Sequence, residues 1–223
     1  MRLLTISLAL ALILSGTSLL HAAPSILGPS GLFTVPTAES LPFGAINANY
    51  YEQERAHGES FVFNSGVLPG LEVGFSRIRL DDSLSTPRAK QTMVNAKFTL
   101  RALTDTEPGI SLGTIDMTDQ VSTALYVVAS ENLPIGQISG IEYLRAHLGL
   151  AAGGHKNSLV PLNGVFGGLE LGVMKHATFS VEHDSDSLNY GVRVQLFDGF
   201  TGDLAFVHEK HYAIYGLTYT HDM

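Results

Sequence analysis

The chain contains no cysteine and no tryptophan, and only 15% of its 223 residues are charged. The lack of cysteine excludes disulfide bonds, thiolate metal sites, a cysteine nucleophile and a lipid-modified N-terminal cysteine. The 13 Lys and Arg are outnumbered by 21 Asp and Glu, giving a formal net charge of −8. Binding to nucleic acid requires a basic surplus and is therefore not expected. An average soluble domain has about 25% charged residues, so uncharged surface must replace charged surface here.

The longest apolar run lies at the N-terminus. Arg2 is followed by a stretch from Leu3 to Leu20 that is interrupted only by Thr, Ser and Gly. This composition predicts a secretory signal peptide over residues 1–22, cleaved after Ala22. The run is also long enough for an uncleaved membrane anchor, which is the alternative. No second run of about 18 apolar residues follows, so no further transmembrane helix is expected.

Downstream of this run, apolar and polar residues alternate with a period of two. In residues 188–196, Leu, Tyr, Val, Val and Leu occupy one face and Asn, Gly, Arg and Gln the other. Such alternation between turn residues is typical of strands. We expect about twelve strands, at 43–53, 59–67, 71–80, 91–101, 109–117, 121–131, 140–150, 165–174, 177–184, 188–196, 202–209 and 212–220. Strands of about 9 to 11 residues can cross a bilayer at a tilt.

The composition of the two strand faces distinguishes a membrane barrel from a secreted β-sandwich. In a sandwich the polar face meets bulk water and is rich in Lys and Glu. Here the polar face consists mainly of Asn, Gln, Ser, Thr and Gly, and the other face of Leu, Val, Phe and Tyr. This predicts an all-β fold, an antiparallel transmembrane β-barrel over residues 43–223 in the outer membrane of a diderm bacterium. Its apolar exterior would contact lipid, around a small polar lumen.

Aromatic residues close to strand ends give weaker support to the barrel, because they could form the girdles found at membrane interfaces. The candidates are Tyr50, Tyr51, Tyr126, Tyr143, Tyr190, Tyr212, Tyr215 and Tyr219. The C-terminus argues against it, since many outer-membrane chains end on an aromatic residue and this one ends His221, Asp222, Met223.

Two motifs stand out from the strand pattern. The first begins in an extended segment, residues 23–42, that is rich in proline and glycine and precedes the first strand; its characteristic residues are Gly31, Pro36, Thr37, Ala38, Pro42 and Gly44. Each proline restricts the residue before it to extended conformations. The second motif is an acidic hairpin followed by an Asn-x-Gly-x-Arg strand, in which the characteristic residues are Asn189, Gly191 and Arg193.

In these two motifs the chain resembles the YjbH-like family of outer-membrane β-barrel proteins. The resemblance implies a barrel linked to exopolysaccharide production or export, either as a conduit or as an assembly partner. Polysaccharide or polysaccharide-export proteins would then be its partners. Family members are usually much longer, so this chain would be a single short barrel unit. A structural or surface-exposed barrel that transports no ligand is the alternative.

Motifs for catalysis or cofactor binding are missing. The sequence has no His-Glu-x-x-His, no Gly-x-Ser-x-Gly, no phosphate loop and no dinucleotide fingerprint. His208 and His211 are three residues apart near a strand end, where their side chains would point to opposite faces. Carboxylates at Glu182, Asp184 and Asp186 could bind Ca²⁺, but a solvated hairpin turn fits them better. We therefore expect no enzyme, cofactor or metal, and an outer-membrane hydrolase is the least favoured alternative.

Strand parity predicts which charged residues face the lumen. If the apolar neighbours on each strand face lipid, six charged residues point inward: Glu72, Lys97, Arg145, Glu170, Glu182 and Arg193. An unpaired charge in a lumen of low dielectric is costly, so opposite charges on different strands should pair. The sequence thus predicts a barrel partly blocked by its own polar network. The alternative is that these groups meet water in an open lumen.

Overall fold

The structure is a computed structural model that describes residues 23–54, 58–79, 90–155, 160–208 and 212–222. The predicted signal peptide, residues 1–22, lies outside the described residues. No helix in the described part of the chain is long and apolar enough to cross a membrane.

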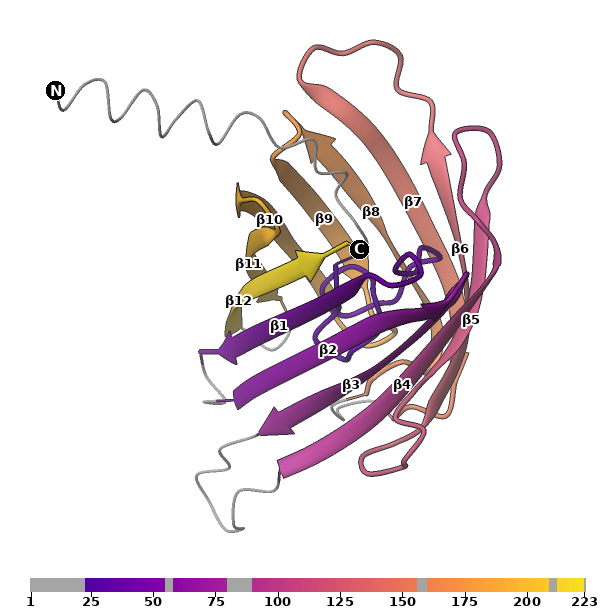
Figure 1. Cartoon of the computed structure of the whole chain (residues 1–223), viewed down its shortest axis with the longest axis vertical. Coiled ribbons are helices and arrows are strands. Elements are labelled where there is room, and N and C mark those ends of the chain that lie inside the picture. Colours follow the sequence, from indigo (N-terminus) through magenta and orange to yellow (C-terminus); the bar gives the residue numbers. More distant parts are fainter. Residues whose placement is uncertain (1–22, 55–57, 80–89, 156–159, 209–211, 223) are drawn as a thin grey trace, which may run out of the picture.

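Twelve antiparallel strands close into a barrel, in which β1 pairs with both β2 and β12 (Figure 1). The strands are β1 Ile46–Gln53, β2 Gly58–Leu68, β3 Leu71–Arg79, β4 Lys90–Arg101, β5 Gly109–Ile115, β6 Ala124–Leu133, β7 Ile141–Ala152, β8 Gly164–Val173, β9 Ala177–His183, β10 Leu188–Phe197, β11 Phe200–Val207 and β12 Tyr212–His221. The predicted fold class is confirmed, and every predicted strand is present with ends that differ by at most three residues.

The connections at the two ends of the barrel differ in length. At the end that carries both the start of β1 and the end of β12, here called the terminus end, β2–β3 and β10–β11 are joined by two-residue turns. Gly70 and Gly199 occupy these turns with φ of 77° and 73°, a conformation that glycine adopts without steric cost. The opposite end, here called the loop end, carries the two longest connections, 80–89 and 153–163.

The outer surface of the barrel is apolar, as the strand parity predicts. Alternate residues of β6 are exposed and buried, and Leu125 and Leu148 are among the most exposed side chains, at 62% and 65%. The prediction of a tyrosine girdle is only partly correct. Tyr50, Tyr190 and Tyr215 are exposed, but Tyr51 and Tyr126 are buried inside the barrel. An apolar surface on a closed sheet, which has no unpaired edge, is suited to lipid.

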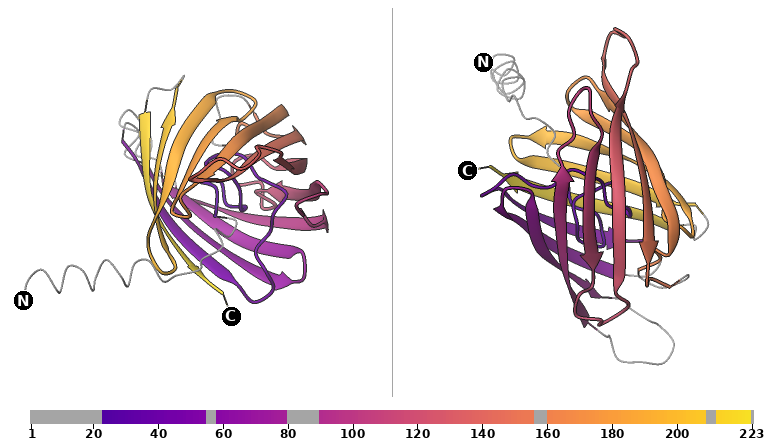
Figure 2. Two further views of the ribbon diagram at one scale, coloured as in Figure 1. Left: turned by 90° about the horizontal axis from the view of Figure 1, so that it is seen from above. Right: turned by 90° about the vertical axis from the view of Figure 1, so that its right-hand side faces the viewer.

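The lumen contains a segment of the chain itself. Residues 23–42, here called the plug, precede β1 and run inside the barrel, where the indigo trace is surrounded by strands in Figures 1 and 2. From Ser25 to Ala38 every residue of the plug is buried. The sequence predicts an extended segment here, but the residues of the segment itself do not show that it lies inside. A twelve-stranded barrel is wider than the eight-stranded barrels whose own side chains fill the interior, so it has room for such a segment.

The loop-end half of the lumen contains two clusters of packed apolar side chains beside its buried polar groups, which corrects the expectation of a polar lumen throughout. Plug residues Leu27, Leu32 and Val35 pack there against buried wall side chains. The wall residues include Ile78, Met93, Ile115, Tyr126 and Phe166, together with Val160 and Leu162 from the β7–β8 connection. A second cluster joins Ile26 and Phe33 of the plug to Tyr51, Val62, Val207 and Ile214. The barrel is therefore sealed at its loop end by packed apolar side chains.

The assignment of the two faces can be tested with a pair of arginine substitutions on β10. We expect Val192→Arg, which places a charge on the outer face, to lower the free energy of unfolding in lipid vesicles by about 2 to 4 kcal/mol. Gln195→Arg should cost much less, because Gln195 points inward and lines a polar cavity. Denaturant titrations of the two variants provide the comparison, and equal losses would contradict the assignment.

Candidate functional site

The plug folds back on itself in the lumen. Isolated bridges join Pro24 to Ser30 and Gly31 to Pro36, and the Leu32 N–H donates to the Val35 carbonyl at 2.9 Å. A Cβ atom at Gly31 would come within 2.2 Å of the Val35 oxygen, so only glycine fits this turn. The tight path turns many N–H and C=O groups of the plug towards the barrel wall.

Glu72 on β3 and Lys97 on β4 hold the plug on one side of the barrel. They are directly opposite each other on neighbouring strands, with Lys97 Nζ 3.9 Å from Glu72 Oε2, and both are buried. Glu72 accepts hydrogen bonds from the backbone N–H groups of Ser30 and Leu41, at 2.8 and 3.0 Å. Lys97 donates to the carbonyl oxygens of Ser30 and Glu39. The pair thus binds the plug by its backbone.

A second set of wall residues holds the plug from β9 and β10. Glu182 accepts hydrogen bonds from the N–H and hydroxyl of Thr34, at 2.7 and 2.6 Å. Asn189, opposite Glu182 on β10, donates to the Thr34 hydroxyl at 3.0 Å. Arg193 donates to the carbonyl oxygens of Pro24, Gly31 and Leu32, at 2.8 to 3.1 Å. Its Nε lies 3.2 Å from Asp203 Oδ1 on β11.

The two motifs that carry the family resemblance lie against each other in this second set. Asn189 and Arg193 bind the plug, and Gly191 between them leaves space for the Phe33 ring, which a Cβ atom would approach to 2.6 Å. The Arg193 guanidinium lies 4.7 Å from the centre of that ring. The Asn-x-Gly-x-Arg strand is thus the docking surface for the Gly-Leu-Phe-Thr part of the plug.

The remaining residues of the first motif guide the plug back to the wall. After the Gly31–Pro36 bridge, the Thr37 N–H donates to Ser30, and the Ala38 N–H donates to Ser130 Oγ at 2.9 Å. The chain then leaves the lumen in a turn in which the Ala45 N–H donates to the Pro42 carbonyl. Gly44 has a φ of 85° and donates its N–H to Gly66, which joins this turn to β2.

Arg145 on β7 connects the plug to a third place on the wall. Its Nη1 pairs with Glu39 of the plug and lies 3.6 Å from Glu170 Oε1, and Glu170 is the residue opposite on β8. Burial is the largest single influence and would raise the pKa of Glu39, but the charges of Arg145 and His147 and local hydrogen bonds together lower it by more, so the pKa lies below its usual range. Glu39 is therefore ionised at neutral pH and holds the plug to Arg145 by an ion pair.

These contacts place all six predicted lumen charges on the inside of the barrel. Three pairs come together there: Glu72 with Lys97, Arg145 with Glu170, and Arg193 with Asp203. Parity alone did not identify Asp203 or Glu39 as partners. The sequence predicts a lumen blocked by paired charges alone. In the structure the plug fills the lumen, and the charged side chains bind the plug. Glu182 differs most from the expected pairing of opposite charges, because its carboxylate binds Thr34 of the plug.

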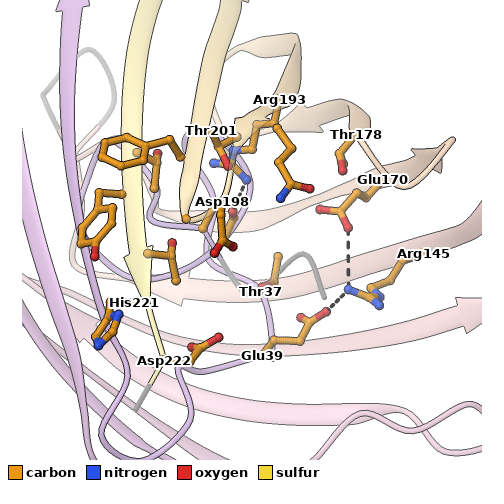
Figure 3. A pocket seen from close by; sticks show the side chains of 18 of the residues that line it. Thr37, Glu39, Arg145, Glu170, Thr178, Arg193, Asp198, Thr201, His221 and Asp222 are labelled. Carbon is orange, nitrogen blue, oxygen red and sulfur yellow. Dashed lines mark hydrogen bonds and ion pairs between the residues drawn. The ribbon is translucent and has the colours of Figure 1, made fainter. Parts of the chain in front are cut away.

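A polar cavity of about 400 Å³ remains at the terminus end, between the plug and the wall (Figure 3). Glu39 and Thr37 of the plug line one side of it, and Arg145, Glu170 and Thr178 line another. Arg193 and Gln195 of β10, the β10–β11 turn and the last residues of β12 complete the lining. The barrel therefore has one sealed end and one end that opens into a polar chamber.

Two polar groupings that resemble catalytic or metal-binding arrangements have structural roles among the described residues. Ser130 Oγ and His147 Nδ1 are 2.7 Å apart, but both residues are buried, and Ser130 also accepts the N–H of Ala38 from the plug. A substrate therefore has no access to this pair. Asp184 accepts the N–H of Ser187 in a hairpin turn. Among the described residues, no group of three or more His, Asp or Glu is arranged to hold a metal ion. His211 lies outside the described residues.

Comparison with known proteins relates the chain to porins by fold only. A structure of the KdgM porin matches with a TM-score of 0.51 and 10% sequence identity, covering 80% of this chain and 99% of the porin. A second structure, of the KdgM porin in complex with disordered oligogalacturonate, matches with a TM-score of 0.47 and 9% identity over the same shares of the two chains. No protein-family model and no curated protein matches the sequence. The chain therefore has a porin-like β-barrel fold.

The contribution of the plug contacts to the stability of the barrel can be measured with a substitution at Arg193. We expect Arg193→Ala to lower the free energy of unfolding by about 3 kcal/mol, because it removes three hydrogen bonds to the plug and leaves Asp203 buried without its cation. Arg77→Ala on β3 is the matched control, since Arg77 is exposed, and it should change stability by about 0.5 kcal/mol or less. Equal losses in denaturant titrations of the two variants would show that Arg193 does not anchor the plug.

Proposed function

We propose that this chain is an outer-membrane β-barrel of the YjbH-like type that assists exopolysaccharide production or export as an assembly partner, and that the barrel is closed at rest. The filled lumen is the observation that carries this proposal. Plug residues Leu32 and Phe33 are almost completely buried in two apolar clusters, and five charged side chains bind the plug at its other contacts. A permanent open conduit is not compatible with this packing.

The lengths of the connections between strands indicate how the barrel is oriented in the membrane. Outer-membrane barrels have short turns on the periplasmic side and longer loops on the extracellular side. The terminus end, with its two-residue turns, would therefore face the periplasm, and the loop end would face the cell surface. In this orientation the apolar core seals the surface side, and the polar cavity opens to the periplasm. A cavity on this side can receive a periplasmic partner or chain without opening a path across the membrane.

The ligand named for the similar porin does not suit the cavity of this barrel. The second matching porin structure is described as a complex with oligogalacturonate, which is an acidic saccharide. The cavity here has four carboxylate residues in its lining, Glu39, Glu170, Asp198 and Asp222, and only two arginines. An acidic chain would meet like charge. The function we propose is therefore based on the closed lumen and the two motifs.

Deletion of the gene in its native host tests the biological role. We expect the amount of secreted polysaccharide to fall, and expression of the wild-type gene from a plasmid to restore it. The protein should fractionate with the outer membrane and migrate differently on a gel before and after boiling. Unchanged polysaccharide in the deletion strain would favour the alternative, a structural barrel without a role in export.

The closed state has its own test in planar bilayers. We expect the wild-type barrel to show no steady large conductance. Arg193→Ala should raise both conductance and preference for cations, because it loosens the plug and leaves lumen carboxylates without their partner. Arg77→Ala, on the outer face, should conduct like the wild type. A steady large conductance in the wild type would overturn the closed state and favour a conduit.

A further inference from the structure

The cavity at the terminus end has an excess of negative charge. Its lining includes Glu39, Glu170, Asp198 and Asp222, against Arg145 and Arg193. Arg193 is already paired with Asp203 and bound to three plug carbonyls, so it contributes little positive potential to the chamber. Arg145 alone stands between Glu39 and Glu170, as Figure 3 shows. The field inside the chamber therefore favours a cation.

The same cavity has a large capacity for hydrogen bonds. Thr178, Thr201 and Thr220 line it besides Thr37 of the plug, and Gln195 adds an amide, whereas the hydroxyl of the fourth lining threonine, Thr218, is already bonded to Asn49 and Asp203. Two acceptor atoms on residues of this lining, Glu39 Oε2 and Gln195 Oε1, are shielded from solvent and have no hydrogen-bond partner in the described part of the chain, so a ligand can bond to them only after these side chains turn towards the cavity. Buried acceptors without partners are rare in native structures. A ligand that brings donors, such as ammonium and hydroxyl groups, would complement this wall.

From the charge and the hydrogen-bonding groups together we propose that the cavity binds an amino sugar, a saccharide unit with a free ammonium group, within a longer chain. The biological setting of this inference rests on the proposed function, since a barrel that assists polysaccharide export would meet such chains in the periplasm. The volume of about 400 Å³ lies within the range of about 300 to 1,000 Å³ typical of small-ligand sites. The ammonium groups of the bound chain would lie near Glu170 and Asp198, and the hydroxyls would bond to the threonines and Gln195.

Three oligosaccharides of equal length that differ in charge provide the test. The purified full-length barrel in mild detergent is titrated by calorimetry with a glucosamine tetramer, an N-acetylglucosamine tetramer and a uronic acid tetramer at pH 6, where the first is cationic. We expect the glucosamine tetramer to bind at least tenfold more tightly than the neutral one, and the uronic acid tetramer not to bind. Raising the salt concentration should weaken binding, because the attraction is partly electrostatic.

Two conservative variants locate the site. Glu170→Gln and Asp198→Asn each remove one carboxylate from the lining, and each should weaken binding of the glucosamine tetramer by about tenfold, the effect of losing a charge-assisted contact. Asp105→Asn is the matched control, because Asp105 is exposed on the β4–β5 connection at the same end of the barrel and does not line the cavity. The gel shift on boiling confirms that each variant is folded.

The outcomes separate this inference from the proposed function. Equal affinity for the three tetramers, no binding of the glucosamine tetramer, or equal loss in Asp105→Asn and Glu170→Gln would overturn the cavity site. None of these results depends on the phenotype of the deletion strain. If deletion reduces secreted polysaccharide while glucosamine chains do not bind, the proposed role in export is supported and the proposed amino-sugar site is rejected. Binding without a deletion phenotype supports the site and rejects the function.

Discussion

The backbone of the plug lies inside a barrel and away from bulk water, so its N–H and C=O groups need hydrogen-bond partners. The wall meets this requirement with charged side chains. Glu72 and Glu182 accept from plug N–H groups, while Lys97 and Arg193 donate to plug carbonyls. Each of the two cations lies directly opposite a carboxylate on the next strand, which balances its charge. The remaining features of the lumen, including the apolar core and the cavity, depend on where this bound segment lies.

The barrel could be predicted from the sequence because a two-residue period carries its own geometry. Alternation along β10 places Asn189 and Arg193 on one face and Tyr190 and Val192 on the other, whatever the partner strands are. Register, in contrast, depends on turn geometry and on pairing between strands. Parity therefore put Arg193 in the lumen, but only the structure places it opposite Asp203. The local pattern thus predicts which face of the sheet a residue lies on. It does not predict which residue lies opposite on the neighbouring strand.

The position of the plug could not be predicted, because nothing local distinguishes a proline-rich segment outside a barrel from one inside it. Two kinds of residue nevertheless carried a signal. Gly168 and Gly191 interrupt strands at inward positions, where a Cβ atom would come within 2.6 Å of Leu32 and Phe33. Glycine inside a strand often marks such a close approach. Apolar residues on both faces near the loop end, as at Phe206 and Val207, indicate an apolar core within the barrel.

The contacts of the plug also bear on the order in which the barrel assembles. Residues 23–42 precede every strand in the chain, yet they bind both Glu72, 42 residues from Ser30, and Glu182, 148 residues from Thr34. Joining such distant parts of a chain has a cost in conformational entropy, which makes the step slow. A plug that has already docked on β3 and β4 offers β9 and β10 a ready surface, on the far side of the β1–β12 seam from the first strands. The segment that closes the finished barrel can thus serve, during folding, as the template around which the last strands wrap.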